Sequence, residues 1–194
     1  CPSRVFAGTL DGRLLALENT WGGQVLPMAD VEAATSLAKR RGLARHLDGA
    51  RLFNAAVASG VPARQIAQHF DSVSVCFSKG LGTPAGSALC GSRDLISRAH
   101  RWRKMAGGGM RQAGVLAAAA LYALDHHVER LAEDHANARY LAEGLQGLPG
   151  VSVATPQSNI VFVDLAADKP ADTVARLRER GVLIARALAR RGAK

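Results

Sequence analysis

Short apolar runs alternate with helical stretches through the first half of this chain, and this alternation constrains the fold most strongly. Four segments have the length and composition of strands: Leu14–Leu17, Leu43–Leu47, Ser72–Phe77 and Gly86–Cys90. Three helices are expected between them: Ala29–Arg41, Arg51–Ser59 and Ala63–His69. The order predicts an α/β fold in which a mixed, mostly parallel sheet has helices on its faces. Ser72–Phe77 is expected to be a buried strand.

The second half of the chain is dominated by longer helical stretches. Three helices are expected: Arg93–Met105, Gln112–Asp125 and His127–Gln146. A strand–strand–helix–strand pattern follows: Val151–Ala154, Asn159–Leu165, Pro170–Arg180 and Val182–Ala185. We therefore expect residues 1–127 to belong to a large domain, and residues 128–194 to form a connecting helix and part of a small α/β domain.

The composition excludes several classes of protein. The chain has 194 residues, of which 48% are hydrophobic, so a disordered protein is excluded. No apolar run approaches the roughly 18 residues of a membrane-spanning helix, and no signal peptide is visible. Three cysteines, Cys1, Cys76 and Cys90, show no metal-ligand spacing, and their odd number favours a reducing compartment, here the cytoplasm. No metal site is expected, and Cys76 and Cys90 are expected in the core.

The net charge of +9 raises the question of nucleic-acid binding. Two segments carry the excess, because residues 98–111 have five basic residues and no acid, and residues 176–194 have seven basic residues and one acid. Aromatic residues make up only 5% of the chain, and no nucleic-acid motif is present. We therefore expect neither nucleic acid nor a membrane as a partner, and a basic nucleic-acid module stays an alternative of low weight.

Lys79 follows the predicted strand Ser72–Phe77 and is itself followed by Gly80 and Gly82. A lysine at the end of a buried strand is expected to be partly buried, and burial lowers the pKa of an amine, as a Schiff-base lysine requires. The glycines would let the backbone pass close to a planar group. Position alone also fits an ordinary loop lysine beside a tight turn.

Asp48 lies at the end of another predicted strand, with Arg51 three residues later. Ligands of open α/β sheets bind at the carboxyl ends of the strands, and a carboxylate there can keep a pyridinium nitrogen protonated. An Asp-Gly pair at a strand end is, taken alone, more often a plain turn. Two neighbouring strand ends that offer an aspartate and a lysine favour a site.

Residues 103–112, RKMAGGGMRQ, place three glycines between Lys104 and Arg111. Glycine N–H groups just before a helix would form a cradle for a phosphate or carboxylate, with the two cations beside it. A solvated basic helix end fits equally well. His126 and His127 have no metal-ligand partner at helical spacing, and both are expected at the surface.

These segments together resemble the low-specificity L-threonine aldolase family of pyridoxal 5'-phosphate (PLP) enzymes, which has the aspartate-aminotransferase-like fold type I. The resemblance covers about residues 14–185. It rests on five stretches: LENT at 17–20, HLDGARLFNA at 46–55, DSVSVCFSKGLGTPAGS at 71–87, RWRKMAGGGMRQAG at 101–114 and RLAEDHANAR at 130–139. It implies that residues 1–127 are part of the PLP-binding large domain and that the small C-terminal domain is incomplete.

The resemblance also implies a role for each candidate residue. Lys79 would form the Schiff base with PLP, Asp48 would pair with the pyridine nitrogen, and Arg51 would contact the phenolic-oxygen side of the ring. Lys104 and Arg111 would help bind the phosphate or line the site, across the subunit interface of a homodimer or homotetramer. The implied reaction is the cleavage of L-threonine or L-allo-threonine, an amino-acid substrate, to glycine and acetaldehyde.

Three departures from the family pattern qualify this expectation. The family sequence begins well before residue 1, Trp21 stands where the family commonly has a histidine, and residues 185–194 do not match the family's continuation. We therefore expect a chain shortened at both ends, with impaired aldolase activity. The alternatives are another fold-type-I PLP enzyme, such as a β-eliminating lyase or a racemase, and a non-catalytic fragment.

Overall fold

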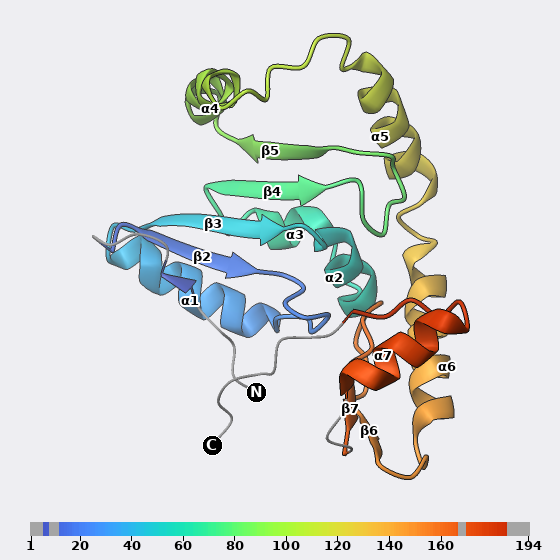
Figure 1. The fold of residues 1–194 in the computed structure, drawn as a ribbon. Helices are drawn as coiled ribbons and strands as arrows, with labels where there is room; N and C mark the ends of the chain where they lie inside the picture. The colour runs from blue at the N-terminus through green and yellow to red at the C-terminus, as the bar shows by residue number, and fades with distance from the viewer. Residues whose placement is uncertain (1–5, 8–11, 167–169, 186–194) are drawn as a thin grey trace.

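A five-stranded sheet forms the centre of the computed structural model, which describes residues 6–7, 12–166 and 170–185 (Figure 1). Its strands lie in the order of the chain: β1 (Phe6–Ala7), β2 (Leu14–Glu18), β3 (Ala44–Gly49), β4 (Ser72–Cys76) and β5 (Ser87–Gly91). The central strands β2, β3 and β4 run parallel, whereas β1 and β5 are antiparallel to their neighbours. The predicted α/β class and mixed sheet are confirmed.

The hydrophobic core lies on one face of this sheet. Three helices cover that face: α1 (Met28–Arg40), α2 (Leu52–Ser59) and α3 (Ala63–Ala67). Side chains alternate along each strand, so Leu17, Leu47 and Val75 pack against the helices while their chain neighbours point the other way. The expectation that Ser72–Phe77 is a buried strand holds only for one face of β4, where Val73 and Val75 are buried, while the other three residues of the strand are half-buried.

The opposite face of the sheet carries polar side chains in register. Glu18 of β2 pairs with Asp48 of β3, which pairs with Ser74 of β4. Two residues earlier on each strand, His46 Nδ1 of β3 lies 2.8 Å from Ser72 Oγ of β4. This row of polar groups leads to the carboxyl ends of the three parallel strands.

The second half of the described chain consists mainly of helices. Its elements are α4 (Arg93–Met105), α5 (Gly114–His126), α6 (Leu131–Leu145), β6 (Val151–Val153), β7 (Val163–Leu165) and α7 (Pro170–Glu179). Helix α4 buries none of its residues. Helix α6 buries four at helical spacing, Leu131, His135, Ala138 and Ala142, and it packs against α2.

Two further expectations from the sequence are wrong. Residues 182–185 form no strand, because no described strand pairs with them; the Val182 N–H instead donates to the Leu177 carbonyl and ends α7. Cys90 on the edge strand β5 is exposed and Cys76 is half-buried, so neither lies in the core as expected. The antiparallel pair β6–β7 confirms two of the three strands expected there, with the second shorter than predicted.

The loop before β7 contacts the turn that follows β2. The buried Ser158 Oγ donates to the Gly23 carbonyl at 2.7 Å, and the Val25 N–H donates to Gln157 Oε1 at 2.8 Å. These bonds join the region after α6 to the five-stranded sheet. The division at residues 127/128 stays a prediction.

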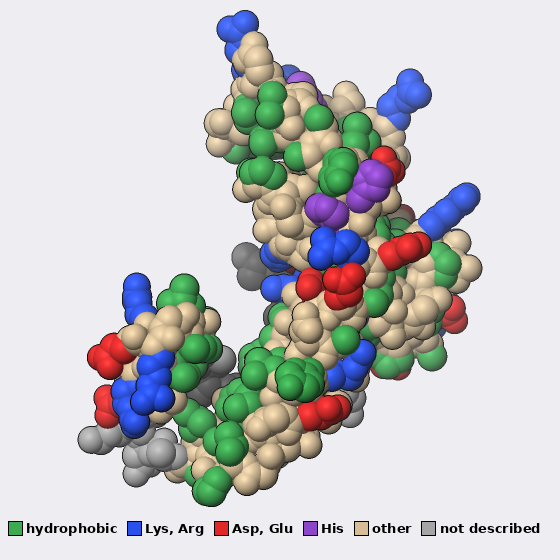
Figure 2. Space-filling view, turned by 90° about the vertical axis from the view of Figure 1, so that its right-hand side faces the viewer, with side chains coloured by type: hydrophobic (Ala, Val, Ile, Leu, Met, Phe, Trp, Pro, Cys, Tyr) green, Lys and Arg blue, Asp and Glu red, His purple; other side chains and the backbone are tan. Residues whose placement is uncertain are grey.

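The side on which α5, α6 and α7 lie carries hydrophobic side chains among charged and histidine side chains (Figure 2). Leu121 and Tyr122 of α5 and Tyr140 of α6 are exposed hydrophobic residues. Within the described residues, no helix has both the length and the apolar character that crossing a membrane requires.

Candidate active site

Four charged residues gather where the parallel strands β2, β3 and β4 end. Glu18 is the last residue of β2, Asp48 is the penultimate residue of β3, Arg51 directly precedes α2, and Lys79 lies in the β4–β5 connection. The charges of Asp48, Arg51 and Lys79 all act on the Glu18 carboxyl group. The structure therefore brings together three residues that the sequence analysis singled out separately.

Asp48 presents an exposed carboxylate on the polar face of the sheet. Its Oδ1 accepts a hydrogen bond from the Ala50 N–H at 3.0 Å, which fixes the side chain, and its carbonyl accepts from the Asn19 N–H at 3.0 Å. One carboxylate oxygen has no protein donor among these bonds. The group is held in place and can accept a proton or hydrogen bond from a ligand.

Arg51 is half-buried, and its Nε lies buried with no hydrogen-bond partner among the described residues. A buried donor without an acceptor costs free energy, so this N–H is available to an acceptor on a ligand. Asn19 Nδ2 and Thr20 Oγ1, which directly follow Glu18, are also buried and unpartnered within the described part of the chain. The end of β2 thus has unused polar groups beside the charged cluster.

Glu18 is the residue that the sequence analysis missed. Burial raises the pKa of the Glu18 carboxyl, the Asp48 carboxylate raises it further, and Arg51 and Lys79 oppose these effects. The LENT stretch contained the signal, because a glutamate that ends a strand next to a predicted site is a candidate in its own right. Its role depends on the β2–β3 register, which the sequence does not specify.

Lys79 is exposed, so the expectation of a partly buried lysine is wrong. Its connection leaves β4 at the open end of the sheet, and the apolar contacts below it are made by Leu81 and not by Lys79. The backbone is nevertheless ordered by its own hydrogen bonds. Gly82 N–H donates to the Lys79 carbonyl at 2.9 Å, and Thr83 N–H donates to the Phe77 carbonyl at 3.2 Å.

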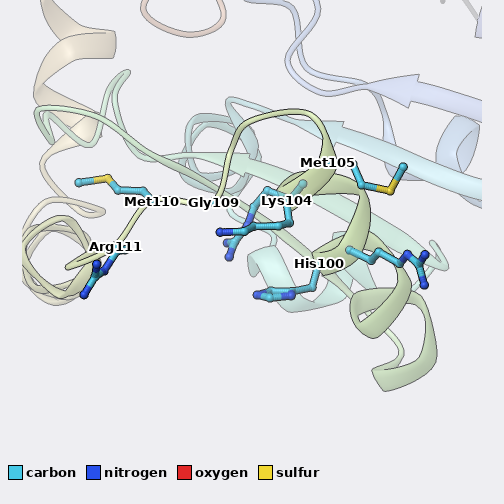
Figure 3. Close-up of a pocket in the computed structure, with 8 residues that line it drawn as sticks. His100, Lys104, Met105, Gly109, Met110 and Arg111 are labelled. Atoms are coloured by element: carbon cyan, nitrogen blue, oxygen red, sulfur yellow. The ribbon is translucent and has the colours of Figure 1, made fainter.

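Lys104 and Arg111 line a separate pocket of about 440 Å³ at the end of α4 (Figure 3). The lining also includes His100, Arg101 and Arg103, and no acidic residue. In Figure 3, Lys104 lies next to Gly109, while Arg111 lies farther along the loop. The pocket suits an anion by charge.

The glycine cradle expected in this segment is not formed. Gly107 N–H donates to the Lys104 carbonyl at 3.2 Å, and Gly108 N–H donates to the Arg103 carbonyl at 2.8 Å, so both groups complete the end of α4. Helix α5 begins only at Gly114. The basic side chains, and not a row of free N–H groups, give this pocket its positive character.

The structure does not bring Lys104 and Arg111 close to the charged residues at the ends of β2, β3 and β4. Glu18 and Asp48 lie on β2 and β3, whereas the loop between α4 and α5 lies beyond β5, the far edge of the sheet (Figure 1). Among the described residues, no cluster of three or more His, Cys, Asp or Glu side chains could hold a metal ion. We call Glu18, Asp48, Arg51 and Lys79 the Lys79 cluster. It is the better candidate for chemistry, because it combines an amine, two carboxyl groups and a guanidinium N–H without a partner among the described residues.

Comparison with known proteins decides the family. The profile of the family described as "Beta-eliminating lyase" matches residues 10–168, which is most of the chain and includes all the candidate residues named above. The chain belongs to the beta-eliminating lyase family.

Several members with related sequences carry a more specific name. The chain is 50% identical over 172 residues to the low-specificity L-threonine aldolase of Escherichia coli K12, an alignment that covers 89% of this chain and 51% of that protein. It is 50% identical over 161 residues to a probable low-specificity L-threonine aldolase of Arabidopsis thaliana, covering 80% and 45% of the two chains. The chain spans about half the length of these curated relatives.

A solved structure gives the same result for the fold. A Listeria monocytogenes protein named as a candidate L-allo-threonine aldolase superposes with a TM-score of 0.77 at 30% sequence identity, over 88% of this chain and 50% of that chain. The similarity to the threonine aldolases expected from the five sequence stretches is confirmed.

Proposed function

We propose that this chain carries the cofactor and reaction site of a PLP-dependent carbon–carbon lyase that cleaves L-threonine or L-allo-threonine to glycine and acetaldehyde. The gathering of Lys79, Asp48 and Arg51 around Glu18 carries the proposal. The printed names of the relatives, L-threonine aldolase and L-allo-threonine aldolase, support the reaction and the substrate class.

The residues of the cluster fit the ring and aldehyde of PLP. The fit rests on the exposed Lys79 amine, the free oxygen of the Asp48 carboxylate, and the buried Arg51 Nε that has no partner among the described residues. When bound, PLP supplies an electron sink for the cleavage of a bond to Cα. The phosphate group would need cations beyond this cluster.

Each residue of the cluster has a task in this proposal. Lys79 Nζ would be the nucleophile that holds the cofactor through its aldehyde. The Asp48 carboxylate would keep the ring nitrogen protonated, and the bond from Ala50 N–H orients that carboxylate. Arg51 Nε would donate a hydrogen bond to the phenolic-oxygen side of the ring, and this bond would satisfy its buried N–H.

The remaining expectations belong to the same proposal. Lys104 and Arg111 would bind the phosphate or line the site from a second subunit in a homodimer or homotetramer. Their distance in the fold from the Lys79 cluster supports a role across an interface better than a role within one chain. The enzyme would act in threonine catabolism and glycine biosynthesis in the cytoplasm.

A second reaction is favoured by the family description, which names β-elimination. The same lysine and aspartate would serve a lyase that releases pyruvate from serine or cysteine. Release of pyruvate without release of acetaldehyde from threonine would favour this reaction. A fold-type-I racemase would give neither product.

The test measures cofactor binding and product formation on the full chain. Addition of PLP should give the visible absorbance of a lysine Schiff base, and L-threonine should then yield acetaldehyde. Lys79→Ala should abolish both signals, whereas Lys39→Ala, at an exposed lysine on α1, should leave both unchanged. A wild-type chain without the absorbance band, or a band that persists in Lys79→Ala, would contradict the proposal.

A further inference from the structure

The connection between β4 and β5, which carries Lys79, packs against α5 and α6, two helices distant in sequence. Leu81 is buried in a small hydrophobic cluster with Ala123 of α5 and Leu131 of α6. The side chains of Phe53 and Phe77 flank this cluster. The position of the connection therefore depends on α5 and α6, and not only on the end of β4.

Gly80, the residue after Lys79, comes into close contact with two of these elements. A Cβ atom on Gly80 would lie 2.8 Å from Leu131 Cδ2 and 3.2 Å from Asn54 Oδ1. Contacts below 3.0 Å require neighbouring atoms to shift, so a side chain at this position would displace the backbone beside Lys79 or its neighbours. The glycine allows this close approach, and its φ lies outside the left-handed region.

Asn54 is fixed in turn by a buried histidine. Its Nδ2 donates to His135 Nε2 at 3.1 Å, and both side chains are 3% exposed. This bond requires a neutral His135 with its proton on Nδ1. It links α2 to α6 directly beneath Gly80.

A second histidine holds the next residue of the connection. His127, which follows α5, donates from Nδ1 to the Leu81 carbonyl at 2.7 Å. The expectation that both His126 and His127 are surface residues is thus wrong for His127, which is half-buried, and right for His126, which is exposed. His126 contacts Tyr122 in a tilted arrangement with a ring-centroid distance of 4.3 Å, and Tyr122 also meets His127 edge-on at 5.5 Å.

We propose that Asn54, His127 and His135 are positioning residues that hold the Gly80–Leu81 backbone and so direct Lys79 toward Glu18 and Asp48. We call these three residues the clamp. The proposal rests on the function proposed above, in which Lys79 is the nucleophile. It makes the reactivity of Lys79 depend on helices that lie outside the five-stranded sheet.

Three variants of the full chain separate positioning from general stability. His127→Ala removes the donor to the Leu81 carbonyl, and His127→Asn keeps a donor close to the position of Nδ1. His126→Ala is the matched control, because it removes the neighbouring imidazole without touching the connection.

The first measurement needs no cofactor. Hydrogen–deuterium exchange should rise in His127→Ala at the Gly82 and Thr83 amides, which bond within the connection, while β2 and β3 exchange as in the wild type. The second measurement follows the Schiff-base absorbance after PLP is added. His127→Ala should react about three- to tenfold more slowly, the loss expected for one hydrogen bond. His127→Asn and His126→Ala should both stay close to the wild type.

Gly80→Ala provides a second probe should His127→Ala fail to fold. It should raise exchange and slow the reaction with PLP, whereas Gly114→Ala, where an added Cβ meets no atom within 4 Å, should do neither. Unchanged exchange and unchanged PLP reactivity in His127→Ala and Gly80→Ala would overturn the clamp and leave the proposed function standing. A wild-type chain that does not react with PLP would overturn the proposed function, and the exchange data would still decide the clamp.

Discussion

Glu18 and Asp48 place two carboxyl groups side by side on neighbouring strands, with Arg51 and Lys79 as the nearby cations. Two like charges in register repel each other, and burial adds to the cost of ionising Glu18. Functional sites often keep charges in positions that lower the stability of the fold, and this pair fits that pattern. The cost of this arrangement should be measurable as a function of pH.

The first prediction concerns Glu18→Gln. The pKa of Glu18 is raised in the folded protein above its ordinary value of 4.5, so the folded state binds more protons than the unfolded state just above that value. The free energy of unfolding should therefore fall as the pH rises through this window, and Glu18→Gln should remove that fall. Urea denaturation of both proteins between pH 4 and 8 measures the effect.

The control for this prediction is Glu32→Gln, at an exposed glutamate of α1. This variant should keep the pH dependence of the wild type. A Glu18→Gln variant that is less stable than the wild type near neutral pH would contradict the prediction.

At this scale, residues at strand ends could be predicted from the sequence, but their surroundings could not. Lys79 and Asp48 follow apolar strand runs, and that local pattern was sufficient to single them out. The exposure of Lys79 depends on what covers the open end of the sheet, and the role of His127 depends on a carbonyl 46 residues away in the sequence. Neither property leaves a local signal.

Helix α6 has a buried face that packs against the rest of the protein and an exposed face on which a residue can be changed without altering that packing. Its buried stripe begins at Leu131 and includes His135, while Gly144 is exposed near the last turn. A glycine inside a helix is unfavourable because the unfolded chain gains more conformational freedom there than with any other residue.

The second prediction is that Gly144→Ala stabilises the protein by roughly 0.5–1 kcal/mol. An added Cβ meets no atom within 4 Å, and φ at Gly144 is not in the left-handed region. Thermal denaturation measures the gain. Gly147→Ala should instead destabilise, because Gly147 has φ of +85° just beyond the helix. Equal melting temperatures for the two variants would contradict the prediction.

Among the elements, those with clear periodicity were predicted within one or two residues. The strands β2 to β5 and the helices α1, α2 and α4 fall into this group. The segment 182–185 has the composition of a strand but lacks a described partner, and a strand without a partner cannot satisfy its backbone. The glycines at 107–109 suggested an anion cradle, yet two of their N–H groups complete α4.

On the scale of the whole molecule, buried polar bonds join the five-stranded sheet to the region that follows α5. Among the described residues, Asn54–His135 and Ser158–Gly23 are fully buried examples. Because a buried bond is costly to leave unsatisfied, the two regions should unfold together in one transition.

The third prediction follows from His135. Burial and the Arg139 charge on α6 lower the pKa of His135 below its ordinary value of 6.5, Asp134 on the same helix opposes them, and α2 contributes the neutral amide of Asn54. Below pH 6.5 the unfolded state therefore binds a proton that the folded state does not. The contribution of His135 to the free energy of unfolding should be constant above pH 6.5 and should fall as the pH drops below it.

His135→Gln provides the comparison, because glutamine cannot titrate. The variant should be less stable than the wild type near neutral pH but should lose less stability between pH 6.5 and 5. Chemical denaturation at a series of pH values measures both proteins. Parallel pH profiles for the two would contradict the prediction.

Strand β5 has a consequence for handling the protein. It forms one edge of the sheet, and no described strand pairs with its outer side. Four of its five residues are exposed, including Leu89 at 42%. Unpaired edges are templates for strand addition between molecules. Concentrated samples should therefore aggregate through this edge, and dilute storage should slow that loss.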